Sequence, residues 1–300
     1  MDAEAQFVDV PTGETIAYRV REGDDGDATP IVLLHGNMTS SVHWDLVFEE
    51  MDPRYTLYAV DMRGFGESTY ETPVDSLDDF ADDVAGVVDA LGLDRFHLMG
   101  WSTGGGVAMA YTAEHTDRVE RLVLVAPVST RGYPIYRKDE EGQPTDEVLT
   151  TKEDIAADPV QVAPILAAYE NEDREMLRTV WDGLIYTDTQ PDEERYEKYL
   201  DDMLTQRNLV DVDYALAYFN VSDEENAYGS GDGRANDVTV PTLVLRGERD
   251  LVIGAGMTEE VMADLPNAEF VELTDAGHSP FVDDLDAVLA EVEGFLAGEE

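Results

Sequence analysis

The sequence predicts an α/β protein with a mainly parallel sheet, flanked by helices and interrupted by an inserted helical cap. Apolar runs typical of buried strands alternate with helical stretches through residues 31–126, and this alternation resumes after residue 240. Between these parts, residues 131–235 carry no signal for parallel strands. A glycine-flanked serine turn at residues 100–104 joins one predicted strand to one predicted helix. We therefore expect right-handed strand–helix–strand units around a single core.

The N-terminal residues predict an antiparallel hairpin at one edge of this sheet. Residues 7–10 and 15–20 alternate apolar and polar side chains on either side of Pro11-Thr12-Gly13, which is the pattern of two half-buried strands joined by a turn. Residues 31–34 then form a continuous apolar run. Such a run is expected of a strand buried on both faces of a parallel sheet.

The remaining elements of the core follow in alternation. Apolar runs predict strands, and apolar residues at helical spacing predict the helices between them. The strands are expected at residues 55–60, 96–101, 121–126, 241–246 and 269–273, and the helices around Trp44 and over residues 80–91, 103–111, 257–265 and 281–296.

The inserted segment divides the core into two parts. We place the first part of the core at residues 1–130, the cap at residues 131–235 and the second part at residues 236–300. The cap contains nine of the 14 tyrosines, together with Trp181. We expect most of these aromatic residues to form the interior of the cap and some to face a substrate cleft below it.

Composition excludes several classes of protein. A chain of 300 residues with 43% hydrophobic residues can fill a large core, and the absence of cysteine excludes disulfides and thiolate chemistry. The acidic first residues and the lack of a long apolar run predict a cytoplasmic protein with no membrane partner. A formal net charge of −48 disfavours nucleic acid, because phosphates would be repelled.

The negative charge also suggests a particular solvent. The 67 acidic residues are spread along segments with an ordinary apolar pattern, so they do not form a disordered acidic tail. At molar salt the screening length falls to about 3 Å, which damps the repulsion among these carboxylates. We interpret the composition as an adaptation to high salt.

Ser102 is the predicted nucleophile. A serine hydroxyl needs a neighbouring base and donors for the developing oxyanion, and the Gly-x-Ser-x-Gly spacing supplies the sharp strand-to-helix turn that exposes it. Gly100 and Gly104 stand where a Cβ would collide with the adjacent backbone. The N–H of Thr103, at the start of the next helix, is one expected oxyanion donor. The N–H of Asn37, after the His35-Gly36 turn, is the second.

His278 is the predicted general base. It is the one histidine of five that follows a late strand on a glycine-containing loop, at the carboxyl edge of the sheet where such sites gather. We interpret His35 and His97 as structural. Asp250 follows the preceding strand and is expected to orient the imidazole, whereas Asp275 and Asp283 lie nearer in sequence but have no clear route to the ring.

The motifs together resemble those of the α/β-hydrolases that carry an inserted lid. The resemblance covers nearly the whole chain and implies an eight-stranded, mainly parallel sheet. The loop at residues 35–41 is similar to the oxyanion loop of haloalkane dehalogenases, but those enzymes have aspartate where Ser102 stands. Trp101 and the glycines after Ser102 resemble intracellular polyhydroxyalkanoate depolymerases.

These inferences predict a serine hydrolase of carboxylic esters that acts through an acyl-enzyme without a metal or cofactor. The expected partner is a small-molecule ester, which includes oligomers of 3-hydroxybutyrate, and the protein is expected to be a monomer or homodimer. Carbon–carbon bond hydrolysis, perhydrolysis of the haloperoxidase type and ligand binding by a non-enzymatic receptor remain alternatives. Turnover of a simple ester would separate the enzymes from the receptor.

Overall fold

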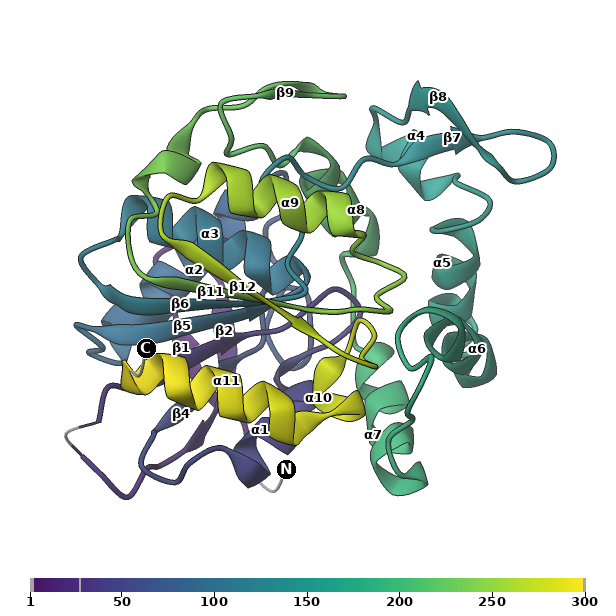
Figure 1. The fold of residues 1–300 in the computed structure, drawn as a ribbon. Helices are drawn as coiled ribbons and strands as arrows, with labels where there is room; N and C mark the ends of the chain where they lie inside the picture. Colours follow the sequence, from purple (N-terminus) through teal and green to yellow (C-terminus); the bar gives the residue numbers. More distant parts are fainter. Residues whose placement is uncertain (1–2, 27, 299–300) are drawn as a thin grey trace.

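An eight-stranded sheet forms the centre of the molecule, in a computed structural model that describes residues 3–26 and 28–298 (Figure 1). The strand order is β1-β2-β4-β3-β5-β6-β11-β12. The hairpin β1–β2 is antiparallel and lies at one edge, and the strands from β4 to β12 run parallel to each other. The strands are β1 (Gln6–Asp9), β2 (Thr15–Arg21), β3 (Ile31–Leu34), β4 (Leu57–Val60), β5 (Phe96–Trp101), β6 (Val119–Val125), β11 (Thr242–Gly247) and β12 (Ala268–Leu273).

Helices cover both faces of the sheet, which confirms the predicted fold class (Figure 1). Helices α2, α3 and α9 pack on one face, and α1 and α11 pack on the other. Strand residues alternate between the two cores: Leu98 of β5 belongs to the first and its neighbour Met99 to the second. The helices of this part are α1 (Asp45–Glu50), α2 (Leu77–Ala90), α3 (Thr103–Glu114), α9 (Ala255–Asp264), α10 (Pro280–Asp283) and α11 (Leu285–Ala297).

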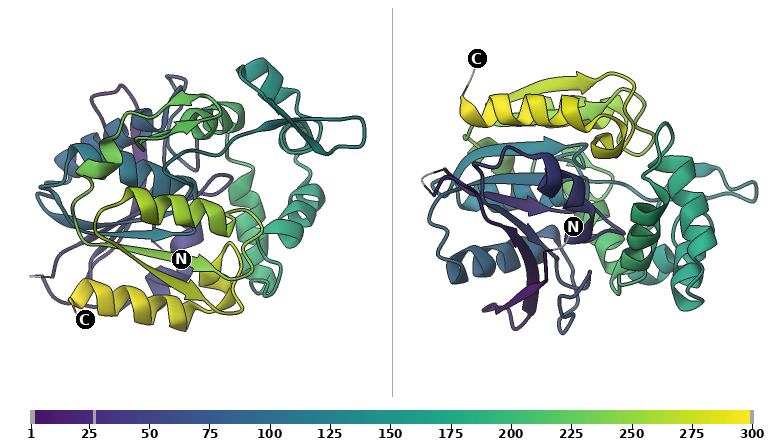
Figure 2. Two further views of the ribbon diagram at one scale, coloured as in Figure 1. Left: turned by 45° about the horizontal axis from the view of Figure 1, so that its top comes forward. Right: turned by 90° about the horizontal axis from the view of Figure 1, so that it is seen from below.

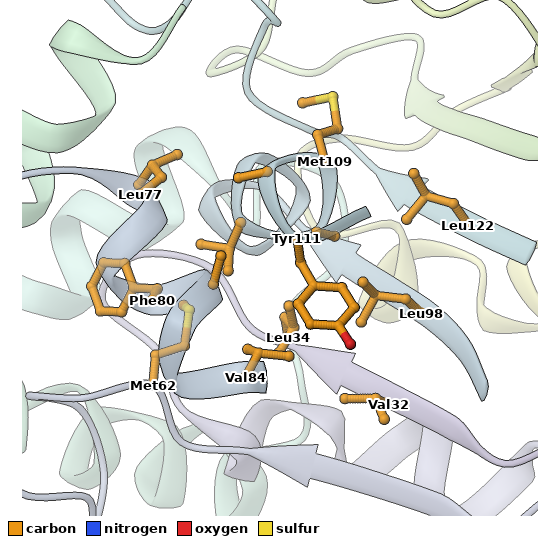
Figure 3. Packing of buried hydrophobic residues seen from close by; sticks show 14 of the residues in the cluster. Val32, Leu34, Met62, Leu77, Phe80, Val84, Leu98, Met109, Tyr111 and Leu122 are labelled. Carbon is orange, nitrogen blue, oxygen red and sulfur yellow. The ribbon is translucent and has the colours of Figure 1, made fainter. Parts of the chain in front are cut away.

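Helix α3 is packed into the first of these cores. Tyr111 of this helix lies beside the strand residues Val32 and Leu98, and Met109 points away from them on the other side of the helix (Figure 3). All four side chains are almost completely buried. Burying one large apolar side chain stabilises a fold by about 1.5–3 kcal/mol, so this core holds α3, and the serine turn at its start, firmly against the sheet.

The segment between β6 and β11 leaves and re-enters the sheet at neighbouring strands. In the views of Figures 1 and 2 its teal and green helices lie beyond one end of the sheet. It contains the helices that the sequence indicates and an antiparallel hairpin, β7–β8, that we did not predict. Its elements are β7 (Tyr136–Lys138), β8 (Pro144–Val148), α4 (Lys152–Ala156), α5 (Ala163–Glu170), α6 (Arg174–Leu184), α7 (Glu193–Met203), α8 (Leu209–Tyr218), β9 (Glu225–Asn226) and β10 (Gly229–Ser230).

The C-terminal helix differs from the prediction. A single helix over residues 281–296 is wrong, because the chain forms the short α10 and then α11. The break falls at Asp284, whose φ of −151° and ψ of 77° are not helical, and whose side chain accepts a hydrogen bond from the N–H of Ala287 at 3.1 Å. Asp284 therefore caps the N-terminus of α11. Because aspartate favours this capping position, α10 ends there instead of continuing as one helix. Within the described residues, no helix is both long enough and apolar enough to span a bilayer.

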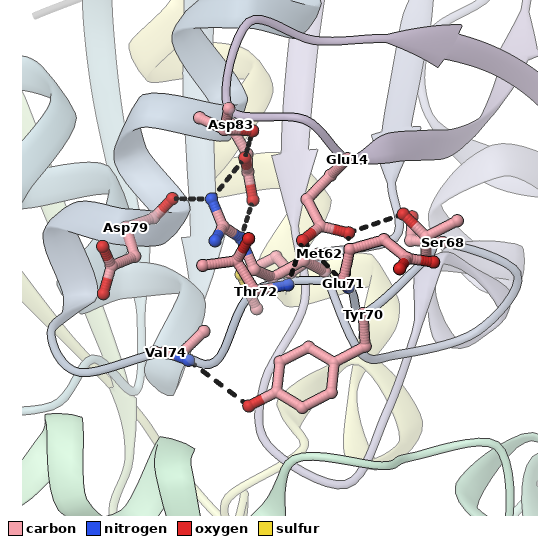
Figure 4. Close-up of polar contacts among 12 residues, drawn as sticks. Glu14, Met62, Ser68, Tyr70, Glu71, Thr72, Val74, Asp79 and Asp83 are labelled. Carbon is pink, nitrogen blue, oxygen red and sulfur yellow. Dashed lines mark hydrogen bonds and ion pairs between the residues drawn. The ribbon is translucent and has the colours of Figure 1, made fainter.

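A buried polar network fixes the chain that follows β4. The carboxylate of Glu14 accepts hydrogen bonds from the N–H groups of Glu71 and Thr72 and from the hydroxyl of Thr69 (Figure 4). Burial acts to raise the pKa of Glu14, but these hydrogen bonds outweigh it, so the pKa lies below its ordinary value. Nearby, the guanidinium of Arg63 forms a buried pair with Asp83 of α2.

Candidate active site

Ser102 lies on a sharp turn between β5 and α3. Its φ of 55° and ψ of −117° place a non-glycine residue in a strained conformation, which costs about 1–3 kcal/mol and is typical of functional turns. A Cβ at Gly100 would lie 2.3 Å from the carbonyl oxygen of Gly104, and a Cβ at Gly104 would lie 2.2 Å from that of Leu34. Glycine is therefore required at both positions, for the steric reason inferred from the sequence.

The structure brings the three predicted triad residues together. The Nε2 atom of His278 lies 3.0 Å from Ser102 Oγ, and its Nδ1 atom lies 2.9 Å from Asp250 Oδ2. His278 and Asp250 are buried, while Ser102 is half-buried. The second carboxylate oxygen of Asp250 accepts hydrogen bonds from the N–H groups of Val252 and Ile253, both at 2.8 Å. These bonds hold the carboxylate in one orientation toward the ring.

Trp101 has a positional role that the sequence analysis did not find. Its indole Nε1 donates a hydrogen bond of 2.9 Å to the backbone carbonyl of His278. Trp101 immediately precedes Ser102, so this hydrogen bond joins the serine turn to the histidine loop that follows β12. The sequence alone does not indicate this contact, because the two residues are 177 positions apart.

The rival carboxylates have other partners. Asp275 pairs with the guanidinium of Arg249. Asp283 accepts hydrogen bonds from the N–H groups of Gly277 and Thr189, at 2.7 and 3.1 Å, and so braces the loop that carries His278. Asp250 is the carboxylate that reaches the imidazole.

None of the other four histidines forms a hydrogen bond with Ser102 among the described residues. His35 is buried and accepts a hydrogen bond from the N–H of Met62 at Nε2, and burial lowers its pKa. Burial also lowers the pKa of His97, to about 4. His43 stacks on Tyr199 at 4.1 Å between ring centroids and pairs with Asp202. His115 lies beside Tyr111 at the end of α3.

Asn37 and Thr103, the two predicted oxyanion donors, both line the space in front of Ser102. Thr103 is the first residue of α3, where the helix dipole favours negative charge. The loop that carries Asn37 passes close to the serine, since a Cβ at Gly36 would lie 3.2 Å from the Cβ of Ser102. The side chain of Asn37 accepts hydrogen bonds from the N–H of Met38 at 3.0 Å and from Gln206 at 2.8 Å. These contacts fix the loop's conformation.

A cavity of about 720 Å³ opens in front of Ser102 and His278. Its walls combine the core with α5, α6 and α8 of the inserted segment, and most of its lining is aliphatic. Of the nine tyrosines in the inserted segment, Tyr133 lines this cavity, and Trp181 lines it as well. This agrees with the expectation that some aromatic residues face the cleft while most are interior, since Tyr186, Tyr196 and Tyr199 are buried.

Asp213 of α8 is the one Asp, Glu, Lys or Arg among the described residues that line the cavity. The amide of Asn37 donates a hydrogen bond to its Oδ1 at 3.1 Å. Burial and, to a smaller extent, the charge of Asp158 raise the pKa of Asp213 to about 7, against the hydrogen bond from Asn37. We did not single out this residue from the sequence, because one acid among 67 has no motif to mark it.

We find no cluster of three or more His, Asp or Glu side chains that could hold a metal ion within residues 3–26 and 28–298. The polar groups that line the cavity include the hydroxyl of Ser102, the imidazole of His278 and the carboxyl group of Asp213, next to the predicted oxyanion donors Asn37 and Thr103. This set suits acyl transfer, in which a hydroxyl attacks and N–H groups stabilise an oxyanion.

Comparison with known proteins identifies the family. The chain matches the model of the alpha/beta hydrolase fold family over residues 29–285. The protein therefore belongs to the alpha/beta hydrolase family. The names of its relatives support the assignment of this protein as a hydrolase.

The curated relatives differ in the reactions that their names describe. The chain is 27% identical over 282 residues to a 2-hydroxy-6-oxononadienedioate/2-hydroxy-6-oxononatrienedioate hydrolase of Paraburkholderia phymatum, with 92% of this chain and 90% of the relative covered. It is 28% identical over 261 residues to a pimeloyl-[acyl-carrier protein] methyl ester esterase of Nitrosomonas europaea, with 86% and 91% covered.

Solved structures include esterases with the same fold. An esterase from Rhodococcus sp. superimposes with a TM-score of 0.71 at 26% identity, and 99% of each chain is covered. An esterase from Exiguobacterium antarcticum gives a TM-score of 0.74 at 19% identity, with 98% of this chain and all of the other covered. The second likeness establishes the fold alone.

Proposed function

We propose that this protein is a serine hydrolase that cleaves neutral carboxylic esters through an acyl-enzyme. The observation that carries the proposal is the hydrogen-bonded series Asp250–His278–Ser102, which ends at a strained serine facing a largely aliphatic cavity. A nucleophile, a base and an orienting carboxylate in this order are what serine-dependent acyl transfer requires.

The reaction would proceed in two halves. Ser102 Oγ attacks the ester carbon while His278 Nε2 takes its proton, and the N–H groups of Asn37 and Thr103 donate to the oxyanion. Collapse of this intermediate breaks the bond to the alcohol, which leaves with the proton from His278. Water then attacks the acyl-enzyme with His278 again acting as base, which releases the acid and restores the Ser102 hydroxyl. Asp250 holds the proton on Nδ1 and stabilises the imidazolium.

The lining of the cavity favours neutral ester substrates over the doubly charged dienedioate substrates named for several relatives. A dienedioate substrate carries two carboxylates, and burying a carboxylate without a partner is costly. The described cavity lining contains no lysine or arginine, and its one carboxyl group, that of Asp213, repels anions when ionised. Carbon–carbon bond hydrolysis remains the second candidate, because the relatives include hydrolases of that name at 27% identity.

The inserted segment would act as a cap on this site. Helices α5, α6 and α8 contribute cavity walls, so a substrate would have to fit beneath them or thread between them. We therefore propose residues 131–235 as a cap domain between two parts of one core, and short-chain esters as the preferred substrates. Soluble oligomers of 3-hydroxybutyrate are candidate substrates if their chain threads the cavity and their terminal carboxylate stays in solvent.

A substrate panel tests the proposal. At molar salt, ethyl butyrate, a long-chain triacylglycerol, soluble 3-hydroxybutyrate oligomers and 2-hydroxy-6-oxononadienedioate are each incubated with the protein, and product acids are measured by chromatography. We expect ethyl butyrate to be cleaved fastest, and Ser102→Ala to abolish cleavage while the circular dichroism spectrum is retained. Cleavage of the dienedioate alone would replace the proposal with carbon–carbon hydrolysis.

A further inference from the structure

Asp213 places a single carboxyl group in a wall that is otherwise uncharged. It is half-buried on α8 and shares the cavity with Ser102 and His278. A carboxylate in such a place loses hydration, and this cost is recovered only by a cation or by hydrogen-bond donors. The described lining contains no lysine or arginine that could act as a partner.

The protein itself forms a hydrogen bond to one of the two oxygens of this carboxyl group. Asn37 donates to Oδ1, and the Asn37 amide oxygen in turn accepts from Gln206, whose own carbonyl oxygen accepts from the hydroxyl of Tyr169. This series fixes Asp213 relative to the oxyanion loop. Among the described residues, none donates a hydrogen bond to Oδ2 of Asp213, so this oxygen is available to a ligand in the cavity.

We propose that Asp213 is a specificity-determining residue that selects esters bearing a hydrogen-bond donor, a hydroxyl or an ammonium group, and disfavours esters bearing a second carboxylate. This inference rests on the proposed esterase function. The donor group binds Oδ2, while the amide of Asn37 keeps Oδ1 in place. A bond from a neutral or cationic donor to a carboxylate is charge-assisted and stronger than one between neutral groups.

The titratable groups around Asp213 come from several elements. Asp158 follows α4, Tyr133 follows β6, Tyr169 belongs to α5, and His278 lies across the cavity with Asp250 behind it. Burial raises the pKa of both tyrosines, so they remain neutral at neutral pH. The Asp213 carboxyl itself, with a pKa of about 7, gains charge as the pH rises through that value. Selectivity for donor-bearing esters should therefore increase over the same range.

Matched substrates and a conservative variant test this inference. Hydrolysis is followed in a pH-stat for ethyl butyrate, ethyl 3-hydroxybutyrate, ethyl 3-aminobutyrate and monoethyl succinate, and for 2-hydroxyethyl butyrate, which moves the donor to the alcohol part. The variant Asp213→Asn keeps an oxygen for the Asn37 amide but removes the charge. Asp201→Asn, which removes an exposed carboxylate from α7, is the control.

The expected readout is a ratio of kcat/KM values. For the unaltered protein, kcat/KM should be higher for at least one donor-bearing ester than for ethyl butyrate. Asp213→Asn should lower this ratio of kcat/KM values by about tenfold or more. The same variant should raise the ratio of kcat/KM for monoethyl succinate to that for ethyl butyrate. Asp201→Asn should leave both ratios unchanged. The hydroxyl-ester ratio should rise from one pH unit below 7 to one above it in the unaltered protein and stay flat in Asp213→Asn. Comparison of the hydroxyl-bearing esters with the amino ester shows whether Asp213 selects a hydroxyl or an ammonium group.

The two proposals fail in different ways. If the unaltered protein hydrolyses none of these esters, the esterase proposal itself is overturned. If it hydrolyses ethyl butyrate but Asp213→Asn changes the rates for all the esters by one common factor, or changes none of them, Asp213 is not a specificity residue and the esterase proposal stands.

Discussion

The indole N–H of Trp101 donates a hydrogen bond to the backbone carbonyl of His278 across 2.9 Å, which joins the residue before the serine to the base that would activate it. The ring of Trp101 also packs against Phe281, with 6.0 Å between centroids. Trp101 therefore contributes, together with Asp283, to the position of the histidine loop relative to the serine turn. The distance between Ser102 and His278 depends on this contact as well as on the two loops themselves.

Trp101→Phe should lower kcat for ester hydrolysis by about tenfold, because a small misplacement of catalytic groups is costly. KM should change less, since most of the cavity wall remains. Steady-state kinetics on ethyl butyrate would measure the two constants separately.

Trp44→Phe is the matched control for this change. Trp44 packs against the same Phe281, with 5.0 Å between centroids, and among the described residues its indole nitrogen has no hydrogen-bond partner. The Trp44→Phe variant also loses an indole ring next to Phe281, but its kcat should not fall. Equal losses of kcat in the two variants would assign the effect to packing instead of the hydrogen bond.

Asp250→Asn should lower the rate of ester hydrolysis by about 10⁴, as the loss of the correct histidine tautomer does in serine proteases. The fold should persist, because an asparagine oxygen can still accept from the N–H groups of Val252 and Ile253. Single-turnover kinetics with unfolding measured alongside would separate the two effects.

The control for this prediction is Asp275→Asn, which removes a carboxylate from a neighbouring loop where it pairs with Arg249. It should retain nearly full activity. A nearly active Asp250→Asn protein would show that another carboxylate orients His278.

Glu14→Gln should destabilise the fold at neutral pH by about 1–3 kcal/mol, because the amide nitrogen that replaces one carboxylate oxygen cannot accept the hydrogen bonds that this oxygen receives from the group of Thr69, Glu71 and Thr72. The folded-state pKa of Glu14 is lowered. Its stabilising contribution is therefore fully present above the ordinary carboxyl pKa and is lost as the pH falls through the lowered value.

Unfolding by urea at a series of pH values would measure this dependence. The gap in stability between the unaltered protein and Glu14→Gln should narrow on acidification below about pH 4. Glu140→Gln, at an exposed turn position, should show no gap at any pH. A gap that does not depend on pH would contradict a role for the ionised carboxylate.

Removal of salt should unfold the protein, because a formal net charge of −48 repels itself once screening is lost. Far-ultraviolet circular dichroism from molar to millimolar sodium chloride should show loss of helix, and sucrose should not replace the salt. Unchanged spectra and thermal midpoints over the whole series would refute an adaptation to high salt.

Local sequence patterns determined much of this protein. The strict steric demand at Gly100 and Gly104 made the serine turn recognisable, since only glycine fits against the backbone there. Continuous apolar runs marked the parallel strands, because both of their faces are buried. The positions of Asp250 and His278 after successive late strands placed both at the same edge of the sheet, where the structure brings them within 2.9 Å.

Tertiary structure alone decided what surrounds the serine. The Trp101–His278 contact, the Asp213 carboxyl in the cavity wall and the burial of Tyr196 and Tyr199 away from the cavity depend on how the inserted segment and the late loops pack. No short-range pattern encodes such contacts, because they join residues far apart in the chain. The sequence alone therefore predicted the fold and the three residues that lie together at Ser102, and the packing of distant segments determined the shape and polarity of the cavity that these residues face.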